Sequence, residues 1–147
     1  MTRLKSLRIV SIVVVMLLAL QFELGMAVNL SPDLHEVPPL ARTPAAVWEA
    51  LTKVGAGAPE HAALGVLLAA ISCASLVMAL RSGTTSVSVM GVASFVAIVL
   101  AGVNGALFAL SGFKNDNYSH GMATTFLLAF SAQFVQICIV TTKLRQH

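Results

Sequence analysis

Charged side chains are scarce in this sequence of 147 residues, because Asp, Glu, Lys and Arg together make up only 10% of it. A soluble domain carries roughly a quarter of its residues as charges, and a chain this short has proportionally more surface to cover than a long one. Hydrophobic residues account for 57% instead. This balance excludes an ordinary soluble domain and indicates one domain surrounded largely by lipid.

Cysteine is nearly absent as well. Cys73 and Cys138 both lie inside apolar segments and outside any C-x-x-C spacing, so neither a disulfide framework nor a zinc site is indicated, and we interpret both as small packing residues. The sequence also lacks G-x-S-x-G, H-E-x-x-H and phosphate-loop motifs. A non-enzymatic role is therefore expected.

Long apolar runs are what the sequence has in place of charge. Each is close to the ~20 residues that a helix needs to cross the hydrocarbon of a bilayer, and lipid offers no partners for the unpaired backbone groups of other structures. The runs cover residues 9–29, 62–80, 87–110 and 121–140. They predict an all-α membrane protein, an antiparallel bundle of four transmembrane helices forming a single domain over residues 1–147.

The few charges are divided between the two sets of helix ends. The cations Arg3, Lys5, Arg8, Arg81, Lys143 and Arg145 fall at one set, and the acids Asp33, Glu36, Glu49, Glu60 and Asp116 fall at the other. Cations remain on the cytoplasmic side of membrane proteins, so both termini are expected to be cytoplasmic. The same pattern argues against a basic face that binds nucleic acid.

The first apolar run has features of a secretory signal peptide. A basic start precedes an apolar core, and Gly25-Met26-Ala27 resembles a cleavage site with two small residues. However, the apolar run continues to Leu30 and is long enough to span. We expect a retained transmembrane helix.

The outer segment 30–60 is the longest polar stretch. Its first half, with Pro32, Pro38 and Pro39, should be irregular. Thr43 followed by Pro44 is typical of a helix start and Gly55 of a helix end, which predicts a short helix over residues 44–54.

This short helix is expected to be amphipathic. Val47, Trp48, Leu51 and Val54 share one face, and Glu49 and Lys53 are spaced for an i,i+4 ion pair. A helix lying on the outer surface with Trp48 at headgroup level is the favoured interpretation. A lid over the bundle is the alternative.

Small residues mark where helices are expected to pack closely in lipid. They recur every four positions in the third run as Ala93, Ala97, Ala101, Gly105 and Ala109, in the second as Gly65, Ala69 and Cys73, and in the fourth as Gly121, Thr125 and Ala129. The first run carries bulkier residues and should lie more peripherally.

Polar residues within the runs gather toward the outer side. Glu23 lies about 9 Å below Asn29 at 1.5 Å per residue, and His61, Asn104 and His120 also belong to the outer half. Apart from Gln133 and Gln136, the inner half is expected to be almost entirely apolar. We therefore predict an outward-facing interhelical site lined by Glu23, His61, Asn104 and His120, with Met26 and Met122 nearby.

Other interpretations of these residues stay open. The histidines can be hydrated at the interface, the methionines can serve packing, and Glu23 can form a structural hydrogen bond with Asn104. One functional alternative is haem b held between the second and fourth helices by His61 and His120 or Met122, the two histidines being the candidate metal ligands. Another is a small transporter or ion pathway that uses Glu23, although an apolar inner half offers it no polar lining.

Four short segments carry a resemblance to known proteins: Gln21-Phe-Glu-Leu-Gly-Met-Ala-Val-Asn-Leu30, His61-Ala-Ala-Leu-Gly65, Asn104-Gly-Ala-Leu-Phe108 and Ser119-His-Gly-Met-Ala123. Together they resemble a group of small four-helix integral membrane proteins of bacteria, actinobacteria among them. The resemblance spans most of the chain and implies the topology and a bacterial plasma membrane, without an activity. The leading expectation is an accessory subunit or an assembly or ligand-binding component, which works as a homo-oligomer or within a larger membrane complex.

Overall fold

The computed structural model describes residues 2–30, 43–55 and 57–146, and within them the regular structure is entirely helical. The helices are α1 (Thr2–Asn29), α2 (Pro44–Val54), α3 (Ala58–Leu80), α4 (Thr85–Leu110) and α5 (Asp116–Arg145). All except α2 are long and apolar enough to cross a membrane. The predicted fold class is thereby confirmed. The prolines at 32, 38 and 39 lie outside the described residues.

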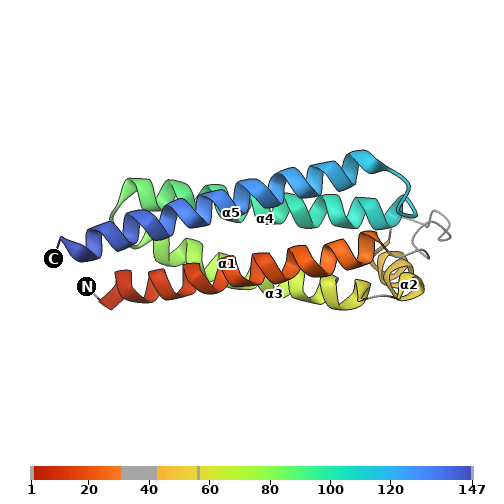
Figure 1. Cartoon of the computed structure of the whole chain (residues 1–147), viewed down its shortest axis with the longest axis horizontal. Helices are drawn as coiled ribbons and strands as arrows, with labels where there is room; N and C mark the ends of the chain where they lie inside the picture. The colour runs from red at the N-terminus through yellow and green to blue at the C-terminus, as the bar shows by residue number, and fades with distance from the viewer. Residues whose placement is uncertain (1, 31–42, 56, 147) are drawn as a thin grey trace.

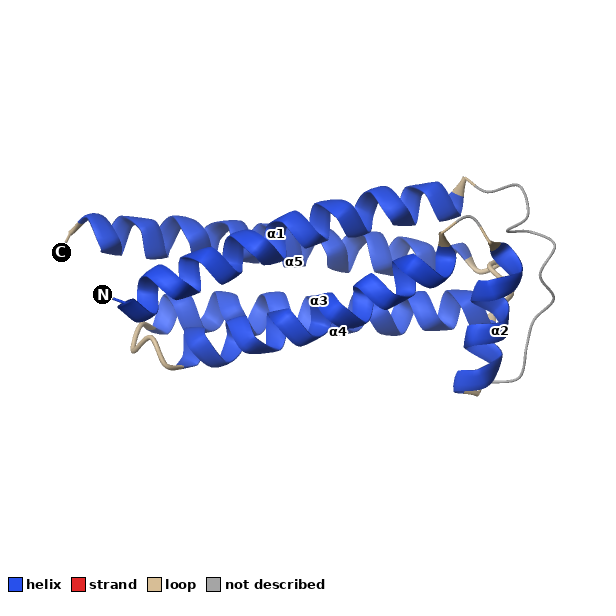
Figure 2. Ribbon diagram, turned by 90° about the horizontal axis from the view of Figure 1, so that it is seen from below, coloured by secondary structure: helices blue, strands red, loops and turns tan. Residues whose placement is uncertain are grey.

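The four long helices form an antiparallel bundle (Figure 1). Around the bundle the order is α1, α3, α4, α5, with α1 also touching α5, so that α1 is diagonal to α4 and α3 is diagonal to α5. The most extensive contact joins α4 and α5, and α1 has the smallest buried share, as its bulkier residues predicted. Both termini lie at one end, and α2 lies across the other (Figure 2).

The helices extend beyond the predicted spans. α1 begins at Thr2 and α5 ends at Arg145, because backbone hydrogen bonding continues from the apolar run into the polar flank, whereas hydropathy locates only the part in lipid. At the start of α5 the Asn115 side chain accepts a hydrogen bond from the Asn117 backbone N–H at 3.2 Å. The turn between α3 and α4 needs Gly83, whose φ is +69°.

α2 has the predicted bounds. The Thr43 hydroxyl caps it by accepting a hydrogen bond from the Ala46 N–H at 3.1 Å, and Gly55 ends it with φ of +63°. The predicted ion pair is present, with Lys53 Nζ at 2.6 Å from Glu49 Oε1. The predicted helix is therefore confirmed.

The packing of α2 matches the lid rather than a helix lying free on the surface. Val54 is fully buried beside Phe108 and Phe113, and Val47 and Leu51 pack against the same cluster. Trp48 remains 55% exposed. α2 therefore covers the end of the bundle opposite the termini, and its tryptophan stays exposed.

The bundle interior contains three apolar clusters in succession. The cluster at the α2 end, called the outer cluster, consists of Val28, Val54, Ala58, Phe108, Ala109 and Phe113. The middle one consists of Val14, Leu18, Leu68, Ala97, Ile98 and Ala129. The inner one, nearest the termini, consists of Leu7, Ala79, Val87 and Val140.

The small-residue seams were predicted only in part. Ala97, Ala109 and Ala129 are buried, and Gly65, Ala69, Ala101, Gly105, Gly121 and Thr125 are partly buried. Ala93, Cys73 and Cys138 are exposed, so the interpretation of the two cysteines as small packing residues is wrong, as is the place of Cys73 in the α3 seam. On α3 the buried face consists instead of Leu68, Ser72, Ser75 and Ala79. The small residues on this face are serines and alanine rather than the predicted glycine and cysteine.

Candidate functional site

His61 and Gln21 form a polar contact near the outer end of the α1–α3 seam. The Gln21 Nε2 lies 3.1 Å from the His61 backbone oxygen and 3.2 Å from the His61 Nε2. A backbone oxygen can only accept, so the group facing it must be the amide N–H₂. The same nitrogen then donates to the imidazole Nε2, which places the ring proton on Nδ1.

Glycines make this contact possible. A Cβ on Gly25 would lie 2.9 Å from the His61 Cε1, and a Cβ on Gly65 would lie 3.3 Å from the Gln21 Nε2. On each helix the large polar residue stands four positions before a glycine: Gln21 before Gly25 on α1, and His61 before Gly65 on α3. Because α1 and α3 are antiparallel, each large residue lies over the other helix's glycine.

Large side chains also lie over glycines of the facing helix between α4 and α5. A Cβ on Gly121 would lie 2.7 Å from the Asn104 Oδ1, and a Cβ on Gly105 would lie 3.3 Å from the Met122 Sδ. The Asn104 Nδ2 donates to the Leu100 backbone oxygen at 2.8 Å. Asn104 and Met122 therefore each lie over a glycine of the facing helix, and Asn104 does not form the hydrogen bond with Glu23 that the sequence left open.

The predicted outer site is thus divided. His61 lies between α1 and α3, Asn104 and Met122 lie between α4 and α5, and Glu23 and His120 are exposed. No hydrogen bond within the described residues joins His61 to His120, Asn104 or Met122. The prediction that one outward pocket collects these side chains is not what the structure shows.

The arrangement does not suit the proposed haem ligands. His61 Nε2 is occupied by the Gln21 amide, and α3 and α5, which carry the two histidines, are diagonal in the bundle. Within the described ranges, no cluster of three or more His, Cys, Asp or Glu side chains is placed to hold a metal ion. Glu23 points outside the bundle and lines no path through it.

Sequence inspection missed a buried polar layer between the middle and inner apolar clusters. Its members are Ser11 on α1, Ser72 and Ser75 on α3, Ser94 on α4, and Gln133 and Gln136 on α5, each no more than 2% exposed. All four transmembrane helices contribute. The prediction of an almost entirely apolar inner half is therefore wrong.

Hydrogen bonds connect the layer across three helices. The Gln136 Nε2 donates to the Ser11 Oγ at 2.9 Å and lies 3.5 Å from the Ser75 Oγ. The Gln133 Nε2 lies 3.4 Å from the same Ser75 Oγ. Both glutamine amides of α5 therefore direct their N–H groups toward α1 and α3.

The signal for this layer was present but weak. Serine is common in membrane helices because its hydroxyl can bond to its own backbone, as Ser72 does to the Ala69 oxygen at 2.9 Å. Serine residues therefore change the mean hydropathy of a predicted span very little. The spacing of the serines along α3 was informative, since Ser72 and Ser75 lie on the same helical face as Leu68 and Ala79.

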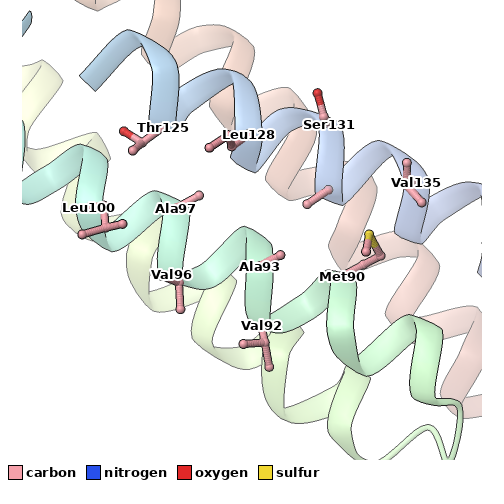
Figure 3. A pocket seen from close by; sticks show the side chains of 11 residues that line it. Met90, Val92, Ala93, Val96, Ala97, Leu100, Thr125, Leu128, Ser131 and Val135 are labelled. Carbon is pink, nitrogen blue, oxygen red and sulfur yellow. The ribbon is translucent and has the colours of Figure 1, made fainter. Parts of the chain in front are cut away.

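A shallow apolar groove runs along the lipid-facing side of the α4–α5 contact (Figure 3). Ala93 and Ala97 form its floor on α4, and Thr125 and Ser131 are its polar members on α5. Bulkier side chains border it: Met90, Val92, Val96, Leu100, Leu128 and Val135. The groove can accept a rod-like apolar neighbour, and nothing in its lining indicates chemistry.

Comparison with models of protein families, with curated proteins and with solved structures gave no match.

Proposed function

We propose that this chain is a non-enzymatic membrane protein of a bacterial plasma membrane that acts as an accessory subunit, in a homo-oligomer or a larger membrane complex. Both termini would be cytoplasmic. The sidedness is supported by Arg3, Lys5, Arg81 and Arg145, which are exposed at the end where the termini lie.

The observation that carries the proposal is the position of Glu23. Its side chain is exposed on α1, and none of the hydrogen bonds or ion pairs in the described part of the chain involves it. On the same exposed side lie Leu20, 50% exposed, and Met26, 41% exposed, with Leu30 further out. Glu23 is therefore embedded in the apolar surface rather than at its edge.

A carboxyl group at this position is unfavourable in lipid alone. An acidic side chain at the centre of a membrane helix costs about 2.5–3.5 kcal/mol on insertion scales, and less toward the interface. The cost is offset when another helix supplies a hydrogen-bond donor at the same depth. A transmembrane helix of a second copy or of a different protein, with a hydroxyl, amide or basic group there, fits this surface.

The test is the oligomeric state in a mild detergent. The wild-type chain should elute as a stoichiometric complex, either with itself or with one co-purifying membrane protein. Glu23→Leu should dissociate it, because leucine removes the hydrogen-bonding group without changing any packing inside the bundle. Glu23→Gln should retain part of the complex, since an amide still forms hydrogen bonds.

Met16 provides the matched control. It lies two helical turns below Glu23 on the same side of α1 and is 66% exposed. Met16→Ala should leave the complex intact. A wild-type chain that elutes as a monodisperse monomer, with no bound protein, would overturn the proposal.

A further inference from the structure

Three oxygen atoms in the buried polar layer have no hydrogen-bond partner among the described residues. They are the Gln133 Oε1, the Gln136 Oε1 and the Ser94 Oγ, and each is inaccessible to solvent. A buried polar atom without a partner is destabilising, because it loses its hydrogen bonds to water without replacing them. Three in one layer indicate a ligand that satisfies them together.

The three oxygens belong to one seam. Gln133 and Gln136 are three residues apart on α5, and Ser94 is three residues from Gly91 on α4. The Gln136 Oε1 lies 3.3 Å from the position that a Cβ on Gly91 would occupy. The antiparallel register that brings Gln136 to Gly91 and Met122 to Gly105 places Gln133 at the level of Ser94.

In both glutamine side chains of the layer, the amide N–H₂ group has a hydrogen-bond partner and the amide oxygen has none. The two amide N–H₂ groups are directed toward Ser11 and Ser75, which leaves the two amide oxygens without a donor. Both oxygens can only accept. The ligand must therefore supply at least two hydrogen-bond donors, and it can accept from the Ser94 hydroxyl.

We propose that a water molecule is bound here, donating to the Gln133 Oε1 and the Gln136 Oε1 and accepting from Ser94. Buried waters in proteins typically make about three hydrogen bonds to such groups. The chemistry favours water over a metal cation, because the layer consists of serines and glutamines and contains no carboxylate. A bare cation would remain an uncompensated charge in a low-dielectric interior.

The apolar clusters isolate this water from both sides of the membrane. Along α1, Leu7 belongs to the inner cluster, Ser11 to the polar layer and Val14 to the middle cluster. The other helices repeat this succession. The water is therefore a fixed part of the bundle that joins α4 to α5, not a step in a continuous aqueous path.

The test is water-to-protein magnetisation transfer in solid-state NMR of the full chain in lipid bilayers. With short mixing times, the Gln133 and Gln136 side-chain amide signals should receive magnetisation from water despite their burial. The buried backbone amides of Val14 and Leu68, in the apolar middle cluster, should not. Failure of both glutamine signals to receive it would overturn the proposal.

The double variant Ser94→Ala and Gln133→Leu leaves only one of the three partners. The Gln136 signal should then lose its transfer from water, whereas the matched variant Ser131→Ala, altered at an exposed site on α5, should keep it. Retention of the transfer in the double variant would contradict the assignment. So would glutamine shifts that follow the exchange of Na⁺ for K⁺ or for a large organic cation, because they would identify a bound cation.

Discussion

Replacing Gly91 with alanine places a methyl group at a close approach of α3 and α4. The new Cβ would lie 2.8 Å from the Ala79 Cβ and 3.3 Å from the Gln136 Oε1. Nearby, the Ser88 hydroxyl donates to the Ala79 backbone oxygen at 3.1 Å, which ties the two helices together. The alanine methyl at 79 cannot rotate away, so a helix must move.

The expected magnitude is a balance of two terms. Overpacking of a well-packed interior costs about 1–3 kcal/mol. Replacing glycine by alanine within a helix returns about 0.5–1 kcal/mol. We expect Gly91→Ala to lower the free energy of unfolding by about 1 kcal/mol net, which corresponds to roughly a 5-fold drop in the ratio of folded to unfolded protein.

The assay is denaturation by SDS in mixed micelles, and Gly102 supplies the control. Gly102 lies on the same helix, and nothing comes within 4 Å of a Cβ built there. Gly102→Ala should therefore be neutral or slightly stabilising. The compensating change Ala79→Gly removes the opposing methyl group, so the double variant should be more stable than the two single effects predict by about 0.5 kcal/mol or more.

Two results would refute this reasoning. If Gly91→Ala is as well tolerated as Gly102→Ala, α3 and α4 do not approach as described. If the effects of Gly91→Ala and Ala79→Gly simply add, the two residues are not in contact.

Two other substitutions test the α1–α3 seam and the docking of α2, and a third serves as a control. Gly25→Ala should lower the free energy of unfolding by about 1 kcal/mol or more, because its Cβ would meet the His61 ring at 2.9 Å; combining it with His61→Ala should relieve the clash, and full additivity would argue against the contact. Val54→Ala should destabilise the docking of α2 by about 1–3 kcal/mol, measured as faster hydrogen exchange in α2, since Val54 is buried against the outer cluster. Lys53→Ala is the control, because it breaks only an exposed ion pair, worth about 0–1 kcal/mol. Equal effects of Val54→Ala and Lys53→Ala on hydrogen exchange in α2 would contradict the packing of α2.

The parts of the fold that depend on single helices were predictable. The long apolar runs determine the spans, and the Thr43-Pro44 start with the Gly55 end determines α2, because these signals are local. The side of α2 that is buried was harder. Val54 is buried through residues of α4 and the following turn, which are far away in the sequence.

The candidate site depended on how the helices pair, which a single sequence does not define. His61 was correctly placed at a seam, but its partners are Gln21 and Gly25 on α1 rather than a residue of the fourth span. Glu23 lies only two positions from Gln21, yet it faces outward. The polar layer was missed because four helices contribute short side chains that form a group only after folding.

The most direct test of the account is the side of the membrane on which each end of the bundle lies. In a background with Cys73→Ala and Cys138→Ala, both at exposed positions, single cysteines would be introduced as Lys53→Cys, Ser82→Cys and Gln146→Cys. A maleimide that cannot cross membranes should label only Lys53→Cys in intact cells and all three after permeabilisation. Labelling of Ser82→Cys or Gln146→Cys in intact cells would contradict a bundle whose C-terminus and α3–α4 turn lie in the cytoplasm and whose α2 lies on the opposite side.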